Sequence, residues 1–406
     1  MKKSSLVKIS DHIPSFLCKS SKTKKNKSLV IKYLDKTLQN LEKNKNVFHM
    51  LSNDFYLEID KKKLKKYEKY KTVIVIGMGG STLGAEAIYQ LFKNKIKKKF
   101  IFFNNLNVDK TKDLLKIKKK NDLFFIIISK SGNTIETLVN ISLFAKLNIN
   151  SLNSVIITEK VDNALSNFAK KKKIYTIEHK KYIGGRYSVL SEVGMIPAFF
   201  MKLKIKNFRT SLLKYLKSSD KEYLAETVSK MSQIYLSKKV NSIIFLNYCP
   251  RLENFLYWSQ QLIAESLGKN KKGLLPLVSS APKDHHSLLQ LYLDGPKDKI
   301  FYIFTNKNKS NLKIKKNIFG KNFKFIKNKK VETIVKAQSD SVKRVLKAKK
   351  IPFKDFEFNE FSEESLGGLF SYFILETIMI GKLLKINPFN QPAVEQVKIL
   401  TKKNLS

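Results

Sequence analysis

Residues 123–137 decide the fold, and their sequence is LFFIIISKSGNTIET. The first six side chains are all apolar, and a short continuous apolar run of this kind predicts a strand buried on both faces. Apolar residues then recur at helical spacing at Leu138, Ile141, Leu143 and Phe144, which predicts a helix. The polar residues between them therefore lie where a parallel strand ends and a helix begins.

The same junction is a candidate anion site. The first amides of a helix lack intrahelical partners, and the helix dipole favours negative charge there. Further donors and a positive charge come from Ser129, Lys130, Ser131, Thr134 and Thr137. We expect a cradle for a phosphate group, with an ordinary N-capped helix as the simpler alternative.

Strand-like and helical patterns alternate on both sides of this stretch, which predicts parallel sheets with helices on both faces. Strands are expected at 73–76, 100–103, 123–128, 155–157, 174–177, 243–246, 300–304 and 323–326. Long helical patterns occupy 251–268, 282–293, 332–347 and 362–385.

A chain of 406 residues with 43% apolar content is too long for a single hydrophobic core. The predicted fold class is α/β, with two tandem, doubly wound parallel-sheet domains, each an α-β-α sandwich. We expect an N-terminal helical arm over residues 1–50, a first domain over 51–200 and a second over 201–385. A C-terminal helical segment is expected over 386–406.

Charge is the most unusual feature of the composition. Lysine and arginine number 79 against 33 aspartate and glutamate residues, so the formal net charge is +46. Such a charge alone favours nucleic acid or a membrane surface as a partner. Nucleic-acid readers usually enrich arginine, but here arginine occurs only at Arg186, Arg209, Arg251 and Arg344. We interpret the spread lysines as compositional drift and expect no specific nucleic-acid partner.

The cysteines and the apolar runs suggest a location. Cys18 and Cys249 offer neither metal-ligand spacing nor a disulfide framework, which suits a reducing compartment. Asp11, His12 and Pro14 interrupt any apolar stretch of the signal-peptide kind. Nowhere do 18 apolar residues follow one another, so no membrane span is expected. The prediction is a cytoplasmic protein.

A glycine-rich turn, GMGGSTLG at residues 77–84, follows the first expected strand. A third glycine would complete a dinucleotide fingerprint, but Thr82 stands three residues after Gly79. No acidic residue follows the second strand to hold a ribose. Glycine lets the backbone approach a ligand closely, so we expect this loop, with Gly80 and Ser81, to line a polar ligand.

Three further motifs carry groups suited to proton transfer or to binding an oxyanion. GGRYSVLS at 184–191 contains Arg186, whose guanidinium fits a delocalised oxyanion. QLIAESLGK at 261–269 places Glu265 near the end of a helix, as a candidate general base. HHSLLQ at 285–290 holds adjacent histidines, which make a poor metal pair but are suited to proton transfer. An ion pair and an exposed helical carboxylate are the simpler interpretations of the first two.

A last motif, NPFNQPAVEQVK at 387–398, follows the final long helix and ends on Lys398. Together the six motifs, in their order along the chain from Gly77 to Lys398, resemble the phosphoglucose isomerase family. The resemblance covers most of the chain, and its most specific parts are residues 184–191 and 265–269. Members of this family are built from two sugar-isomerase (SIS) domains, which agrees with the alternation described above.

The resemblance implies reversible isomerisation of glucose 6-phosphate and fructose 6-phosphate through a cis-enediolate, in glycolysis and gluconeogenesis, without a metal or an organic cofactor. Glu265 matches the general base, and Arg186 matches the arginine that stabilises the enediolate. His286 matches the ring-opening histidine, and Lys398 the lysine that assists at the ring oxygen. The residues expected to bind substrate are Gly79, Gly80, Ser81, Ser129, Lys130, Ser131, Thr134, Thr137, Gln261 and Gln391.

In this family the active site lies between subunits, with the histidine donated by the partner, so a homodimer is expected. The chain departs from the family pattern in its short length and in Met78 and Ala393, where isoleucine and glycine are usual. One alternative is an enzyme that also isomerises mannose 6-phosphate. Another is a non-catalytic SIS protein that binds a sugar phosphate, which would not need Glu265, His286 and Lys398 together.

Overall fold

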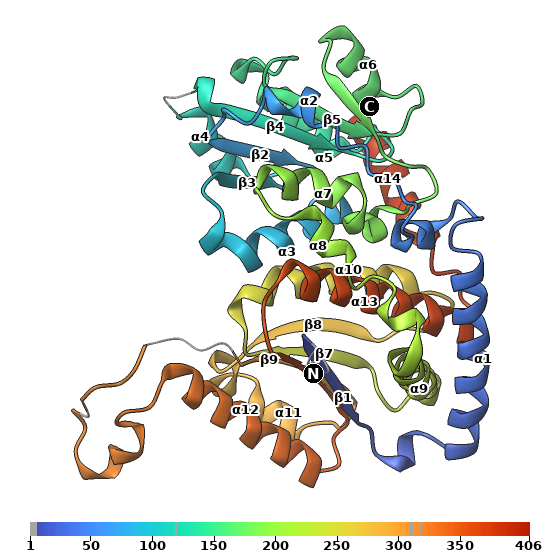
Figure 1. Cartoon of the computed structure of the whole chain (residues 1–406), viewed down its shortest axis with the longest axis vertical. Helices are drawn as coiled ribbons and strands as arrows, with labels where there is room; N and C mark the ends of the chain where they lie inside the picture. The colour runs from blue at the N-terminus through green and yellow to red at the C-terminus, as the bar shows by residue number, and fades with distance from the viewer. Residues whose placement is uncertain (1–5, 118–119, 308–311, 317) are drawn as a thin grey trace.

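The computed structural model describes residues 6–117, 120–307, 312–316 and 318–406. Two five-stranded sheets lie at opposite ends of the molecule, with a layer of helices between them (Figure 1). This arrangement confirms the predicted α/β class with two sheets. The boundaries expected after residues 50, 200 and 385 remain predictions.

The first sheet is entirely parallel, in the order β3-β2-β4-β5-β6. Its central strand β4 is buried at every position, which explains its continuous apolar sequence. The strands are β2 (Thr72–Ile76), β3 (Lys99–Phe103), β4 (Leu123–Ile128), β5 (Ser154–Thr158) and β6 (Tyr175–Glu178). The helices of this half are α2 (Lys61–Lys65), α3 (Leu83–Phe92), α4 (Val108–Leu115), α5 (Ile135–Leu143), α6 (Ala164–Lys171), α7 (Glu192–Phe200) and α8 (Ile205–Arg209).

The second sheet has the order β1-β10-β9-β7-β8, and only β1 is antiparallel to its neighbour. Its strands are β1 (Val7–His12), β7 (Ser242–Asn247), β8 (Leu275–Ser280), β9 (Lys299–Asn306) and β10 (Phe353–Phe358). The remaining helices are α1 (Ser20–Gln39), α9 (Ser218–Ser237), α10 (Glu253–Leu267), α11 (Leu289–Asp294), α12 (Val331–Ala348), α13 (Glu363–Leu383) and α14 (Pro392–Leu405). In each sheet the second strand is added on one side of the first strand and the third strand on the other side. This reversal of strand order creates a switch point, which lies between β2 and β4 in the first sheet and between β7 and β9 in the second.

Three local expectations need correction. The N-terminal arm is not helical throughout, because β1 precedes α1 and pairs with β10. The strand expected at 323–326 belongs to a short 3-10 helix, η11 (Lys321–Ile326), with exposed aromatic side chains. The edge strand β8 and the strand β10 were not anticipated, and the antiparallel β1 makes the second sheet mixed rather than purely parallel.

The helices α3, α7, α8, α10 and α13 lie between the two sheets (Figure 1). Among the described residues α13 is the one helix long and apolar enough to cross a membrane, and 89% of its most apolar window is buried in the protein. It begins at a capping box of Ser362 and Ser365, which satisfies its first amides. The burial is that of a core helix.

A buried ion pair joins α13 to the second sheet. Lys354 on β10 is fully buried, and its ammonium contacts the carboxylate of Glu376 on α13. The same ammonium lies 2.7 Å from the Tyr372 hydroxyl. Removing one charge from such a pair is much more costly than removing both.

Candidate functional site

The glycine loop after β2 brings three segments into contact. Gly79 has a φ of +52°, and a Cβ there would lie 2.7 Å from Nε2 of Gln261 on α10. A Cβ on Gly80 would lie 2.3 Å from the carbonyl of Gly185. Both positions therefore need glycine, for close packing against other parts of the chain. Ser81 is buried at the end of the same turn, η3 (Gly79–Ser81).

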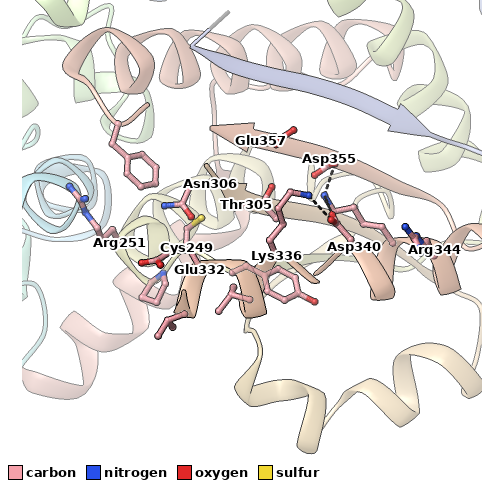
Figure 2. Close-up of a pocket in the computed structure, with 16 residues that line it drawn as sticks. Cys249, Arg251, Thr305, Asn306, Glu332, Lys336, Asp340, Arg344, Asp355 and Glu357 are labelled. Carbon is pink, nitrogen blue, oxygen red and sulfur yellow. Dashed lines mark hydrogen bonds and ion pairs between the residues drawn. The ribbon is translucent and has the colours of Figure 1, made fainter. Parts of the chain in front are cut away.

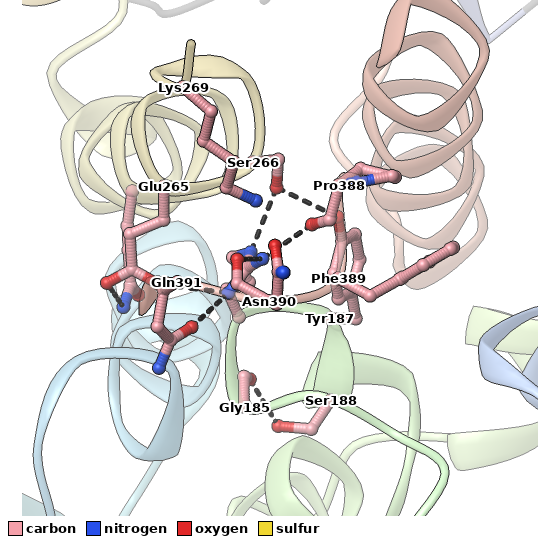
Figure 3. Close-up of polar contacts among 12 residues, drawn as sticks. Gly185, Tyr187, Ser188, Glu265, Ser266, Lys269, Pro388, Phe389, Asn390 and Gln391 are labelled. Carbon is pink, nitrogen blue, oxygen red and sulfur yellow. Dashed lines mark hydrogen bonds and ion pairs between the residues drawn. The ribbon is translucent and has the colours of Figure 1, made fainter. Parts of the chain in front are cut away.

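Arg186 lies at the centre of the site, in the 3-10 helix η7 (Gly185–Leu190), and is almost fully buried. Its Nε donates to the Ser266 hydroxyl at 2.9 Å, and Nη1 donates to Glu265 Oε2 at 3.2 Å. Nη1 also donates to the Gln391 amide oxygen. Figure 3 shows these groups converging from three separate segments of the chain. The guanidinium is thus held in a fixed orientation by its planar donors.

Glu265 lies one helical turn after Gln261 on α10, so both side chains project from one face. Its Oε1 accepts a hydrogen bond from Gln261 Nε2 at 3.0 Å, while Oε2 accepts from Arg186. The Glu265 side chain is 33% exposed, against 2% for Arg186. The carboxylate is therefore oriented by two neighbours and still open to a ligand.

The segment 387–391 closes the site from the C-terminal end. Nη2 of Arg186 donates to the carbonyl oxygens of Pro388 and Asn390, and the Tyr187 hydroxyl donates to the Pro388 oxygen at 2.8 Å. Lys269 donates to the Asn387 oxygen at 2.6 Å. Burial, together with the nearby guanidinium, lowers the pKa of Lys269 to about 8.

A cavity of about 670 Å³ opens beside this segment. Its lining includes Glu265, Lys269, Asn390 and Gln391. The volume falls in the range typical of small-molecule sites, about 300–1,000 Å³. Glu265 and Gln391, both bonded to the buried Arg186 guanidinium, thus line a cavity large enough for a small polar substrate.

The predicted cradle lies at the carboxyl end of β4, as expected. Ser129 is buried, its Oγ accepts from the Gly132 amide at 3.1 Å, and it lies 3.0 Å from Thr134 Oγ1. Gly132 has a φ of +66°, and a Cβ there would lie 1.8 Å from Oδ1 of Asn163. Glycine is therefore required for the turn into α5, and Ser131 remains exposed at its tip.

Two of the predicted cradle residues have other surroundings. Lys130 donates to the Lys181 carbonyl at 2.8 Å and lies 3.6 Å from a carboxylate oxygen of Glu159. It therefore ties the cradle to the loop that leads to η7. Thr137 is buried within α5, and its hydroxyl has no hydrogen-bond partner among the described residues.

The structure does not bring His286 and Lys398 into this cluster. His286 is exposed on η10 (Lys283–His286), whereas its neighbour His285 lies 2.6 Å from the Tyr248 hydroxyl. Lys398 is exposed on α14 and pairs with Glu395 at 2.7 Å. Within the described parts of the chain, no contact joins either residue to Glu265.

Sequence reasoning did not single out several residues that build the site. They are Tyr187, Ser266, Lys269, Asn387, Pro388 and Asn390, all inside motifs that sequence analysis had selected. Lys269 contributes its ammonium, and the others contribute carbonyl oxygens or buried hydroxyls, which carry no sequence signal of their own. Within the residues that the structure describes, no group of three or more His, Cys, Asp or Glu side chains could hold a metal ion.

The chain is similar to known proteins over most of its length. The profile of the phosphoglucose isomerase family matches residues 24–406. The glucose-6-phosphate isomerase of Methanocaldococcus jannaschii is 32% identical over 351 residues, which cover 83% of this chain and 84% of that protein. That of Campylobacter jejuni is 31% identical over 356 residues, covering 84% and 86%.

Solved structures show the same fold. A glucose-6-phosphate isomerase from Chlamydia trachomatis superimposes with a TM-score of 0.78 at 16% identity, covering 98% of this chain and 88% of that chain. A hypothetical protein from Thermus thermophilus reaches a TM-score of 0.84 at 22% identity, covering 98% and 100%. Both share the two-sheet architecture over nearly their whole length.

Proposed function

Because this chain belongs to the phosphoglucose isomerase family, we propose that it interconverts glucose 6-phosphate and fructose 6-phosphate. The observation that carries the proposal is the Arg186–Glu265–Gln391 cluster beside a cavity. A protein that only binds a sugar phosphate needs no carboxylate oriented by a buried guanidinium. The relatives from Methanocaldococcus jannaschii and Campylobacter jejuni, both named glucose-6-phosphate isomerase, also favour the enzyme over that alternative.

In this proposal the substrate phosphate binds at the start of α5. The exposed Ser131 hydroxyl and the half-buried Thr134 hydroxyl donate to phosphate oxygens, and the unpaired amides of the first helical turn add donors. Ser129 stabilises the turn, because its hydroxyl oxygen accepts a hydrogen bond from the Gly132 amide. Lys130 contributes long-range positive charge rather than a direct contact, because its ammonium is already bonded.

Glu265 acts as the base that moves a proton between C2 and C1. Its two hydrogen bonds fix the direction of the carboxylate, and its exposed side faces the cavity. The enediolate formed between the two steps is negatively charged, and Arg186 offers a fixed positive charge next to the base. One such preorganised donor contributes about 3–4 kcal/mol of transition-state stabilisation.

Ring opening is assigned to His286 and Lys398. Neither reaches Glu265 within one chain, and both are exposed. We therefore propose a homodimer in which the partner subunit supplies the histidine, completing each site. The exposed apolar side chains of α14, Val394, Val397 and Leu400 among them, support a subunit contact near Lys398.

We also propose a cytoplasmic location and a role in glycolysis and gluconeogenesis. Both cysteines are unpaired, and Cys249 is buried, as suits a reducing compartment.

A coupled assay tests the activity directly. Purified protein supplied with fructose 6-phosphate should produce glucose 6-phosphate, detected with an NADP-linked dehydrogenase. A parallel assay with mannose 6-phosphate distinguishes a bifunctional enzyme, and we expect no turnover there. Absence of turnover with fructose 6-phosphate in a folded preparation would reject the proposed function.

Subunit mixing tests the shared site. Glu265→Gln and His286→Ala homodimers should each be inactive, and exchange of subunits should create hybrid dimers with one intact site. If subunit exchange is demonstrated and no activity returns, the histidine acts within its own chain.

A further inference from the structure

The second sheet has a cavity where the first sheet has its proposed phosphate cradle. The cradle follows β4 at the first switch point, between β2 and β4. The corresponding switch point lies between β7 and β9. In open α/β sheets the crevice outside the carboxyl ends of the strands at a switch point is the usual ligand position. A cavity of about 580 Å³ occupies this crevice in the second sheet.

The cavity is built by strand ends and one helix. Tyr248 to Arg251 follow β7, Thr305 and Asn306 end β9, and Glu332 lies in the first turn of α12. Asp355 and Glu357 project from β10. Figure 2 shows these side chains arranged around a common space, with Thr305 and Lys336 near its middle. None of these residues belongs to the cluster around Arg186.

Three buried polar atoms in this cavity lack hydrogen-bond partners among the described residues: Thr305 Oγ1, Glu332 Oε2 and Asp355 Oδ1. Thr305 is only 8% exposed. An unpaired buried polar group is costly, so such groups normally have a partner in the functional state. The two carboxylate oxygens accept hydrogen bonds, and the Thr305 hydroxyl can accept or donate one, so a ligand that satisfies all three atoms must bring at least two donors.

The charged side chains of the lining balance one another and do not select for a phosphate. Four carboxylates and four basic side chains face the cavity: Glu332, Asp340, Asp355 and Glu357 with Arg251, Lys336, Lys343 and Arg344. Several of these are already paired, as in Lys343 with Asp355 at 2.8 Å and Lys336 with Asp340. The lining as a whole is formally neutral, which favours neither a strong anion nor a strong cation.

The remaining walls are apolar and aromatic, from Tyr248, Val331, Val335 and Phe361. The cavity thus combines acceptor carboxylates and the Asn306 amide with aromatic faces. This combination suits a molecule with hydroxyl groups on one side and C–H groups on the other. We propose that this cavity is a second small-molecule site, which binds an uncharged polyhydroxylated compound, a polyol or unphosphorylated sugar, through Thr305, Glu332 and Asp355.

Sorbitol is a suitable probe, titrated against the full-length protein by saturation-transfer NMR. Saturable binding is expected. Glu332→Gln removes an acceptor carboxylate and should weaken binding about tenfold. Thr305→Val, nearly identical in shape, should weaken it about fivefold. Both variants should remain folded in thermal melting, because each alters a group without a protein partner.

Matched variants locate the binding. Glu360→Gln changes an exposed carboxylate outside the cavity and should leave sorbitol affinity unchanged. Glu265→Gln should also leave it unchanged, which separates this site from the proposed isomerase site. The proposal is overturned by absence of saturable binding, by full affinity in both cavity variants, by weakening in Glu265→Gln, or by competition from inorganic phosphate.

Discussion

Replacing Arg186 with lysine tests the role of the guanidinium at the centre of the site. The side chain donates five hydrogen bonds, to three side chains and two carbonyl oxygens. A lysine ammonium has three donors on one nitrogen atom. It therefore cannot reach all the acceptors that surround the three nitrogen atoms of the guanidinium. Ser266 and Pro388 keep their bonds to the Tyr187 hydroxyl, which limits the damage.

The magnitude follows from the bonds that are lost. Hydrogen bonds to a charged donor contribute about 1.5–3 kcal/mol each, and with partial compensation the free energy of unfolding should fall by about 3 kcal/mol. The enediolate loses a fixed donor, so kcat should fall by roughly 100- to 1,000-fold. Urea titration measures the first effect, and the coupled assay with fructose 6-phosphate measures the second.

Arg209→Lys is the matched control. Arg209 is a partly buried arginine that donates to the Ser52 carbonyl and lies over the Phe55 ring, away from the cluster. It should lose stability without a comparable loss of kcat. If folded Arg186→Lys retains kcat within about threefold of wild type, about 0.7 kcal/mol, the proposed role of the guanidinium is wrong.

Three further predictions concern the cradle, the buried ion pair and Lys269. The Ser131→Ala, Thr134→Ala double variant should raise KM for fructose 6-phosphate about tenfold with little change in kcat, and an unchanged KM would reject the cradle. Glu376→Leu leaves the Lys354 ammonium buried without its carboxylate, and should lower the free energy of unfolding by about 3–5 kcal/mol. The Glu376→Leu, Lys354→Met double variant should recover most of that loss in urea titrations, and failure to recover would contradict the argument. The pKa of Lys269 is lowered from 10.5 to about 8 by burial, so between these values the unfolded chain binds the proton and the folded chain does not. The stability of wild type relative to Lys269→Met should therefore rise as the pH increases through this interval, and a falling difference would contradict the low pKa.

The strands that sequence reasoning located are those with the simplest environment. β4, buried on both faces, is continuously apolar and was predicted in full. β10 has the sequence FKDFEF, in which charged residues alternate with phenylalanine, and its buried Lys354 gives no sign in sequence of the carboxylate that pairs with it. β8 contains Pro276, which argues against a strand except at an edge, where β8 lies. The aromatic run 323–326 has strand composition but no neighbouring strand to pair with.

Sequence reasoning also located some parts of the site and missed others. Motifs selected the segments, and the resemblance assigned Glu265 and Arg186, which the structure places 3.2 Å apart. The sequence could not indicate that Arg186 binds the carbonyl oxygens of Pro388 and Asn390, because every residue has a carbonyl and only tertiary structure selects among them. The resemblance assigned His286 to the site of a partner subunit, and its exposed position in a single chain leaves that assignment a prediction.

The most direct measurement concerns the proton at C2. In D₂O, wild-type protein incubated with glucose 6-phosphate should exchange the C2 proton with solvent, followed as loss of its ¹H NMR signal. Glu265→Gln keeps the size of the side chain and one of its two acceptor oxygens, but removes the base. It should abolish the exchange while leaving affinity for the hexose phosphate nearly unchanged. Exchange at the wild-type rate by folded Glu265→Gln would contradict the account.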